Sequence, residues 1–287
     1  MAIAMITGTS SGIGLATAVT LARAGHKVIA TIRNLDASSE IQKIIETEGL
    51  PVMVAKLNVD DDDSVKDAIN KVLIENGRID ILVNNAGIPG QLGAVEEVPF
   101  GIFRQVMETN FFGALRCVKA VIPSMREHRN GCIVNVTWVA GRVASAAMGS
   151  YCASKWAFEA LSECLAQEMR PFNLRVVIVE PGFIETPIFS KVVQGPENSP
   201  YPHRRRLGAR FSALRTRASS PYLIATQIQQ IVEGYSSQFR YAIGGEAASV
   251  IAARASKTDE EIVALGRESD GDFKTRMKRE FGLEVVL

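Results

Sequence analysis

Short apolar runs alternate along this chain with longer segments in which apolar residues recur at helical spacing. Each run is almost continuously apolar and only a few residues long, which is typical of a strand buried on both faces. The longer segments place apolar residues three and four positions apart, which predicts helices packed on one side. We expect strands at 2–7, 27–33, 52–59, 81–87, 132–137, 174–182 and 239–244. We expect helices at 13–24, before Gly49, from Asp60–Asp63 onward, at 101–126, 151–169 and 221–234, and through the tail from 246.

This alternation predicts an α/β fold in which a doubly wound parallel sheet carries helices on both faces. The strand and helix pattern is interrupted at 187–220, which is rich in arginine, proline, serine and glycine. We therefore expect residues 1–287 to form a single Rossmann-type domain, with 187–220 as a lid over the substrate and 246–287 as a helical extension. The mixed charges at 257–280 predict a surface helix.

Composition narrows the range of functions. The chain has 287 residues, of which 47% are hydrophobic and 22% charged, and its net charge is +1. That balance is ordinary for a globular protein and favours neither nucleic acid nor a membrane surface as partner. The N-terminus lacks the pattern of a signal peptide, and no apolar stretch reaches the ~18 residues of a membrane span. We expect a cytoplasmic protein with a small-molecule substrate and no metal site.

The four cysteines show no CxxC spacing. They are Cys117, Cys132, Cys152 and Cys164, and each lies within an apolar or helical pattern. In a cytoplasmic protein this usage predicts buried, reduced thiols.

A glycine-rich turn connects the first strand to the first helix. Glycines at this place let the backbone approach a pyrophosphate, and the free N–H groups of the helix start hold its charge. The spacing is TGxxxGxG, which differs from the commoner GxGxxG. The residues assigned to this dinucleotide site are Gly8, Thr9, Ser10, Ser11, Gly12, Ile13 and Gly14.

The end of the second strand indicates which nucleotide binds. A carboxylate there would bind the ribose hydroxyls of NAD, but the position is Ile32. Arg33 follows, and its guanidinium suits a 2′-phosphate, so we expect NADP(H) as cofactor, with NAD(H) second. Further cofactor contacts are expected where the next strands end, at Asn58, Val59, Asn85, Ala86 and Gly87.

The motifs TGTSSGIG, NNAG, Asn110 within METNFFG, YCASK and EPGFIETP follow one another in this order over residues 2–190. In order and spacing the chain resembles the short-chain dehydrogenase/reductase family. The resemblance implies that Tyr151 is the general acid/base and that Lys155, one helical turn later on the same face, lowers its pKa and binds the nicotinamide ribose. It also implies that Asn110 anchors a water linking Lys155 to solvent. Pro181, Gly182, Ile184 and Thr186 correspond to the loop over the nicotinamide.

Trp138 departs from the family pattern. The family has a serine thirteen residues before the tyrosine, whose hydroxyl holds the substrate carbonyl, and this position is Trp138. An indole has a donor but no acceptor and is far larger. Trp138 is therefore assigned to the substrate side, where it blocks a carbonyl, takes over the donor role or stacks on a flat substrate.

Three neighbouring hydroxyls are candidates to replace the serine. Thr137 is one residue early and is expected to point to the opposite face of its strand unless a bulge turns it inward. Ser145 and Ser150 lie in and just after the following loop. The loss of one such hydrogen bond costs on the order of 3–4 kcal/mol at the transition state, which slows a reaction without abolishing it.

These observations predict an NADP(H)-dependent oxidoreductase that interconverts a carbonyl and an alcohol on a small or lipophilic substrate. Two alternatives follow from Trp138: a catalytically impaired NADP-binding homologue, or an atypical enzyme that acts on C=N or C=C bonds or isomerises its substrate. The stretch 187–220 holds seven lysines and arginines and one acid, which suits either a solvated lid or attraction of an anionic substrate. By analogy with the family, the helices at 101–126 and 151–169 predict a homodimer or homotetramer.

Overall fold

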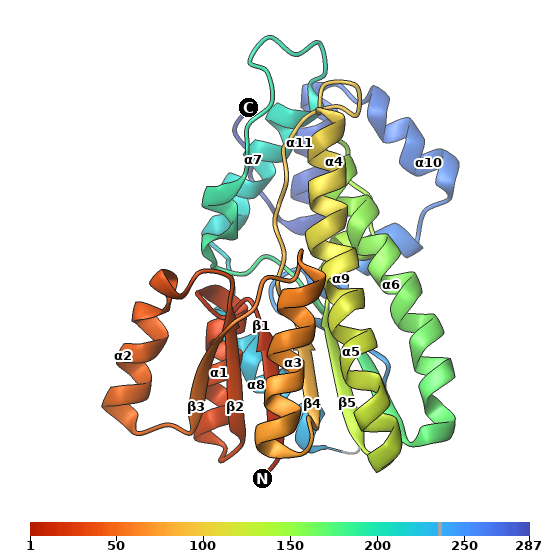
Figure 1. The fold of residues 1–287 in the computed structure, drawn as a ribbon. Coiled ribbons are helices and arrows are strands. Elements are labelled where there is room, and N and C mark those ends of the chain that lie inside the picture. The colour runs from red at the N-terminus through yellow and green to blue at the C-terminus, as the bar shows by residue number, and fades with distance from the viewer. Residues whose placement is uncertain (235–236) are drawn as a thin grey trace.

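Seven parallel strands form one sheet in the computed structural model, which describes residues 1–234 and 237–287. The strand order is β3-β2-β1-β4-β5-β6-β7, which confirms the predicted doubly wound fold (Figure 1). The strands are β1 (Ile3–Thr7), β2 (Lys27–Ile32), β3 (Val52–Lys56), β4 (Ile81–Asn84), β5 (Gly131–Val136), β6 (Leu174–Pro181) and β7 (Arg240–Ile243). Six of them fall within the apolar runs that predicted them, and β5 begins one residue before its run. The agreement is close because a strand covered on both faces is largely apolar on both.

Helices cover both faces of this sheet. One hydrophobic core joins the sheet to α1, α2 and α8, and a second joins it to α3, α5 and α6. The α-helices are α1 (Gly12–Arg23), α2 (Ser39–Glu48), α3 (Asp62–Asn76), α4 (Phe100–Met107), α5 (Gly113–His128), α6 (Gly149–Met169), α7 (His203–Arg215), α8 (Pro221–Glu233), α9 (Ala247–Ala255), α10 (Asp259–Ala264) and α11 (Asp270–Phe281). Short turns of other helix types lie at η1 (Leu35–Ser38), η2 (Glu108–Phe112), η3 (Val139–Gly141), η4 (Arg170–Phe172), η5 (Pro187–Lys191) and η6 (Leu265–Arg267).

The strand order reverses between β1 and β4. Ile6 of β1 pairs with Ala30 of β2 on one side and with Val83 of β4 on the other. Successive crossovers then lead away from this point in opposite directions, which opens a crevice at the carboxyl ends of the strands. Helices α7, α10 and α11 lie beyond this same end of the sheet (Figure 1).

The helix expected at 101–126 is not a single regular helix. It consists of α4, one π-helical turn at Glu108–Phe112, and α5. The chain stays helical throughout, so apolar spacing alone did not reveal the wider turn. The π turn carries Asn110.

Two further expectations need correction. The tail at 257–280 was predicted as one surface helix, but it forms α10 and α11, and Phe273 and Met277 of α11 are buried. Of the four cysteines expected to be buried, three are buried, whereas Cys164 is exposed because it lies on the outer side of α6. In the described ranges, no helix combines the length and the apolar character needed to cross a membrane.

The basic stretch within 187–220 does not form an open, solvated segment throughout. Residues 203–215 form α7, and Arg206 is only 7% exposed. Arg205 and Arg206 both pair with Asp270 at the start of α11. The tail therefore neutralises part of the positive charge of this stretch.

Candidate functional site

A cleft of about 350 Å³ opens at the crevice between β1 and β4. The glycine turn, the ends of five strands, the start of α6 and one residue of α7 surround it. The predicted site residues that line this cleft are Gly8, Ser10, Ser11, Gly12, Ile13, Arg33, Asn58, Val59, Asn85, Ala86, Gly87, Trp138, Tyr151, Lys155, Pro181, Gly182, Ile184 and Thr186. Thr9, Gly14 and Asn110 do not line it.

The glycine turn has the backbone that a close approach requires. Gly8 and Gly12 have φ of 73° and 62°, a region that side chains disfavour. A Cβ on Gly12 would lie 3.1 Å from the Thr186 side chain, across the mouth of the cleft. Helix α1 begins at Gly12 without a side-chain hydrogen bond from its N-cap residue, Ser11. Its first N–H groups are therefore open to an anion in the cleft, which is the arrangement a pyrophosphate needs.

Thr9 and Gly14 support this turn from inside. The Thr9 hydroxyl is fully buried and donates to the Thr31 carbonyl at 3.1 Å. A Cβ on Gly14 would lie 2.3 Å from the Gly8 carbonyl oxygen. Their assignment to cofactor contact is corrected: both residues hold the shape of the turn, and neither faces the cleft.

The end of β2 presents Arg33 at the cleft. Ile32 before it is buried and contributes no carboxylate. Within the described ranges, Arg33 forms no ion pair, so its guanidinium is available to an external anion. These features suit the 2′-phosphate of NADP.

Asp60 is a cleft residue that sequence reasoning had used only as a helix-start signal. Its Oδ1 is buried and has no hydrogen-bond partner among the described residues. It lies beside Asn58 and Val59, which are expected to contact the cofactor. A buried acceptor without a donor is costly, and the amino group of adenine would supply one. The signal was available, since Asp60 follows the same strand end directly.

Tyr151 and Lys155 project from the first turns of α6 into the cleft. The Lys155 Nζ lies 5.7 Å from the centre of the Tyr151 ring and donates to the Val136 carbonyl at 3.1 Å. Burial lowers the pKa of Lys155 to about 8, and the negative charge of Glu159 opposes that shift. No hydrogen bond of the described residues engages the Tyr151 hydroxyl, so it is free to meet a substrate.

The expected lowering of the Tyr151 pKa does not hold for the protein without its cofactor. Burial instead raises the pKa of Tyr151, with a smaller contribution from Cys152. The low-dielectric surroundings disfavour the charged phenolate. In the chain without its cofactor the phenol therefore keeps its proton.

Asn110 lies in the π turn, and its side chain is held between the loop after β4 and α6. Its side chain is 1% exposed. The Oδ1 accepts from the Ile88 N–H at 2.8 Å, and the Nδ2 donates to the Ile88 carbonyl and to the Ser154 hydroxyl at 3.0 and 3.1 Å. The side chain thus fixes the loop after β4 against α6, and both hydrogens of its Nδ2 are engaged by the protein itself.

Trp138 lies directly beside Tyr151. Their ring centres are 5.6 Å apart in an edge-on arrangement, and Phe211 of α7 lies 6.3 Å away on another side. The indole Nε1 donates to the Gly182 carbonyl at 2.8 Å. Its donor is therefore engaged, so the interpretation in which it replaces the serine's donor is wrong for this structure. Trp138 also has φ 128° and ψ 159°, a combination almost confined to glycine.

None of the three candidate hydroxyls reaches the reaction side of the cleft. Thr137 lines the cleft, but its hydroxyl donates to Glu159 Oε1 at 2.7 Å and is thereby engaged within the protein. Ser150 has a buried hydroxyl near Gly90, and Ser145 faces other surroundings; neither lines the cleft. Among these neighbours, therefore, no hydroxyl takes the place of the missing serine.

The substrate side of the cleft is an apolar wall that sequence reasoning did not assign. Its members are Leu92, Met148, Phe189, Val192 and Phe211. A signal for Phe211 was present, because Leu207, Phe211 and Leu214 recur at helical spacing within the arginine-rich stretch. Leu92 and Val192 lie in irregular segments and Phe189 lies in the short helix η5, where periodicity gives no guide.

Comparison with known proteins places this site in context. Residues 2–197 match the family model described as short chain dehydrogenase. The chain is 40% identical to retinol dehydrogenase 8 of Bos taurus over 202 residues, which is 69% of this chain and 64% of that protein. The match thus spans slightly less than two thirds of that relative's length.

Two solved structures share the fold. A short-chain dehydrogenase from Streptomyces avermitilis is 32% identical with a TM-score of 0.81, over 93% of this chain and 98% of that one. An alcohol dehydrogenase from Thermococcus sibiricus, complexed with 5-hydroxy-NADP, is 26% identical with a TM-score of 0.70, over 84% and 94% of the two chains. The similarity therefore extends beyond the motifs to most of the architecture.

Proposed function

Because the chain belongs to the short-chain dehydrogenase/reductase family, we propose that it is an NADP(H)-dependent oxidoreductase that interconverts a carbonyl and an alcohol on a lipophilic substrate. The observation that carries the proposal is the convergence of Tyr151, Lys155 and the uncapped start of α1 on one cleft with an apolar wall. The relatives' printed activities, an alcohol dehydrogenase and a retinol dehydrogenase, support the same class of reaction.

The cofactor, when bound, supplies or takes up the hydride. The glycine turn and the first N–H groups of α1 bind its pyrophosphate. Arg33 binds the 2′-phosphate, and the unpartnered Oδ1 of Asp60 accepts from the adenine amino group. Both groups are present without partners in the described chain, which supports the fit.

Tyr151 transfers the proton to or from the substrate oxygen. In the reducing direction its hydroxyl donates to the oxygen of the substrate as that oxygen becomes negative. The raised pKa of Tyr151 keeps the phenol protonated until then. Lys155, with its pKa lowered to about 8, is ready to exchange a proton near neutral pH and to stabilise the phenolate that remains.

The wall around Trp138 selects the substrate. Leu92, Met148, Phe189, Val192 and Phe211 offer no polar side-chain partner, so a hydrophobic molecule with one reactive oxygen fits best. The indole ring adds a flat surface beside the reacting hydroxyl. A planar or conjugated substrate would lie against it.

One observation favours a second candidate function. With the Trp138 N–H engaged by Gly182, Tyr151 is the donor that remains beside the wall. A carbonyl would lack the second hydrogen bond, whereas reduction of a C=N or C=C bond does not require it. The same fold and cofactor site would serve this reaction.

The deciding experiment measures NADPH oxidation against a panel of aromatic ketones, lipophilic aldehydes, cyclic imines and enones. Turnover of ketones or aldehydes that is lost in Tyr151→Phe supports the proposal. Turnover of imines or enones alone supports the second candidate. Failure to bind NADPH in a titration contradicts both.

A homodimer or homotetramer belongs to the same proposal. Phe112 at the end of the π turn and Trp156 of α6 are 42% and 47% exposed, and both lie on the helical segments expected to pair. Exposed aromatic residues at such places are typical of subunit contacts. Light scattering of the native chain and of Trp156→Glu tests this, and a native monomer contradicts it.

A further inference from the structure

A second cavity, of about 340 Å³, lies between the loop after η3, helix α7 and the C-terminal helices α9, α10 and α11. No described residue lines both this cavity and the cleft. Its apolar part is formed by Leu207, Val250, Phe273, Met277 and Phe281. Nothing in the proposed reaction uses this space.

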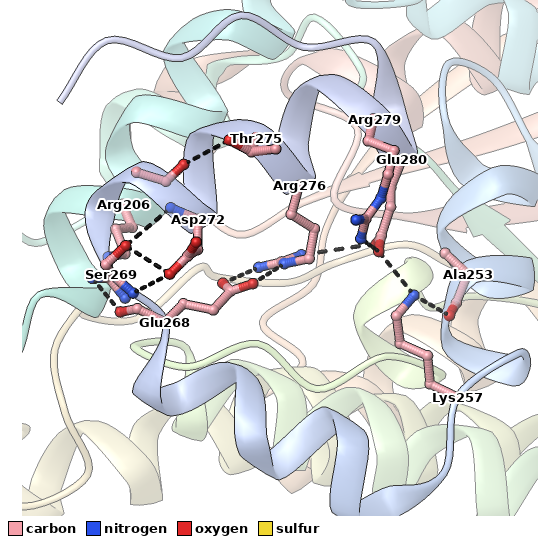
Figure 2. A network of polar contacts seen from close by, with 11 residues as sticks. Arg206, Ala253, Lys257, Glu268, Ser269, Asp272, Thr275, Arg276, Arg279 and Glu280 are labelled. Atoms are coloured by element: carbon pink, nitrogen blue, oxygen red, sulfur yellow. Dashed lines mark hydrogen bonds and ion pairs between the residues drawn. The ribbon is translucent and has the colours of Figure 1, made fainter.

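The cavity is also lined by several cations, and four of them have acidic partners. Figure 2 shows part of the network along α11. Arg276 pairs with Glu268 at 2.6 Å, and Lys257 pairs with Glu280 at 3.2 Å. The remaining two pairs are Arg206 with Asp270 and Arg254 with Asp259. These four charges are therefore balanced within the protein.

Arg210 of α7 is the exception. Its Nε is buried without a hydrogen-bond partner, and the structure gives it no ion pair in the described ranges. Its guanidinium makes a cation–π contact with the Phe281 ring, whose centre lies 5.2 Å from the guanidinium carbon. Glu246 and Arg276 also face it at longer range.

An unpaired guanidinium in such a place is costly. Burial lowers the pKa of Arg210, the charge of Arg276 adds to this, and Glu246 opposes it without reaching ion-pair distance. A guanidinium nevertheless keeps its proton in proteins, so the positive charge stays. Arg210 as a whole is half-buried, and a charge in such surroundings is stabilised when an opposite charge hydrogen-bonds it.

We propose that this cavity is a ligand site for an amphipathic monocarboxylate, whose carboxylate binds Arg210 and whose apolar chain packs among Leu207, Phe273 and Phe281. One unpaired cation calls for one negative charge, and a guanidinium binds a carboxylate through two parallel hydrogen bonds. The apolar lining accounts for the rest of the ligand. The site is separate from the nucleotide cleft and does not depend on the proposed reaction.

The site nevertheless lies near the reaction centre. Arg210 borders a small void that Trp138 and Phe211 also line, and those two residues form part of the cleft wall. A ligand on Arg210 would thus steady α7 next to Phe211.

The test uses calorimetric titration of the whole chain with decanoate, and with decanol and acetate as probes that lack the charge or the tail. Decanoate is expected to bind about tenfold or more tightly than either probe, because both halves of the site must be occupied. Arg210→Met is expected to weaken decanoate by about tenfold or more through loss of the charge-assisted bonds. Arg215→Met, on the exposed end of the same helix, is the matched control and is expected to bind as the native chain does.

Thermal unfolding shows whether Arg210→Met is folded, and its melting temperature without ligand is expected to match or exceed that of the native chain. Saturation with NADPH is expected to leave decanoate affinity unchanged, and this arm does not require any catalytic activity. Equal binding of decanol, unchanged affinity in Arg210→Met, or displacement of decanoate by NADPH would each overturn the proposal.

Discussion

The indole N–H of Trp138 donates to the carbonyl oxygen of Gly182 at 2.8 Å. The bond joins the end of β5 to the loop after β6, on either side of Tyr151. It gives Trp138 a structural partner, which explains how a bulky residue is held at a backbone conformation almost confined to glycine. It also removes the one donor that the indole could have offered to a substrate.

Replacing Trp138 with serine tests whether the ring limits carbonyl reduction. We expect Trp138→Ser to raise kcat/KM on ketones by about a hundredfold, because a hydroxyl there adds a second hydrogen bond to the developing oxyanion. NADPH consumption on the aromatic ketone panel measures this. Trp138→Phe keeps the bulk and loses the N–H, so it serves as the control and is expected to gain nothing. A loss of turnover in Trp138→Ser would mean that the indole takes part in the reaction.

Arg33→Asp tests the preference for NADPH. The change removes the proposed partner of the 2′-phosphate and adds a repelling charge, so we expect NADPH to bind at least about tenfold more weakly. NADH lacks that phosphate, and its affinity is expected to stay the same or to rise. Fluorescence titration with each nucleotide measures the two effects. An equal loss for both would refute the role given to Arg33.

Asp60→Leu gives the complementary result. Both nucleotides carry adenine, so we expect both to bind about five- to tenfold more weakly when the buried acceptor is lost. The same titrations separate this uniform loss from the selective loss in Arg33→Asp. Asp63→Leu, in the exposed first turn of α3, is the control. Unchanged affinity in Asp60→Leu would place the adenine elsewhere.

Lys155 predicts a dependence of stability on pH. Its pKa is lowered to about 8 by burial, from 10.5, so the folded chain loses this proton before the unfolded chain does. Between these two values the unfolded state binds more protons, and stability contributed by Lys155 therefore rises with pH. Below pH 8 the buried charge costs its full penalty, on the order of 3 kcal/mol.

Urea unfolding of the native chain and of Lys155→Met between pH 7 and pH 10 measures this effect. The free energy of unfolding of the native chain is expected to increase relative to that of the variant as the pH rises through 8 toward 10. The comparison with Lys155→Met cancels the titration of other groups. A constant difference would show that Lys155 has an ordinary pKa in the folded chain.

Much of the fold could be predicted because buried parallel strands have a strong signature. The run from Val176 to Val179 is continuously apolar and buried, which is typical of a strand covered on both faces. The π turn at Glu108–Phe112 could not be predicted, because its residues keep helical spacing on either side. The burial of Phe273 and Met277 depends on how the tail packs on α7, and amphipathic spacing does not specify the partner.

The site was predictable to a similar degree. The positions of residues at strand ends, such as Arg33, follow from the topology once the strands are known. The same holds for the strand-end residues that lie near Tyr151 in the cleft. The directions in which side chains point were harder to predict. The sequence identified Asn110 and Trp138 as site residues but did not reveal the partners of their side chains. Those partners, Ile88 and Gly182, lie in segments far away in sequence.

The π turn that carries Asn110 changes the direction around the helix axis in which the following side chains point. Each residue of an α-helix turns the chain by about 100°, and a π turn holds one residue more than an α turn does. Within the turn Asn110 meets Ile88, and directly after it Gly113 meets Val59, where a Cβ would come within 2.8 Å of that side chain. Deletion of a single residue here would straighten the helix and force it to give up one of the two contacts, so the extra residue lets one helix serve both the reaction side and the nucleotide side of the cleft.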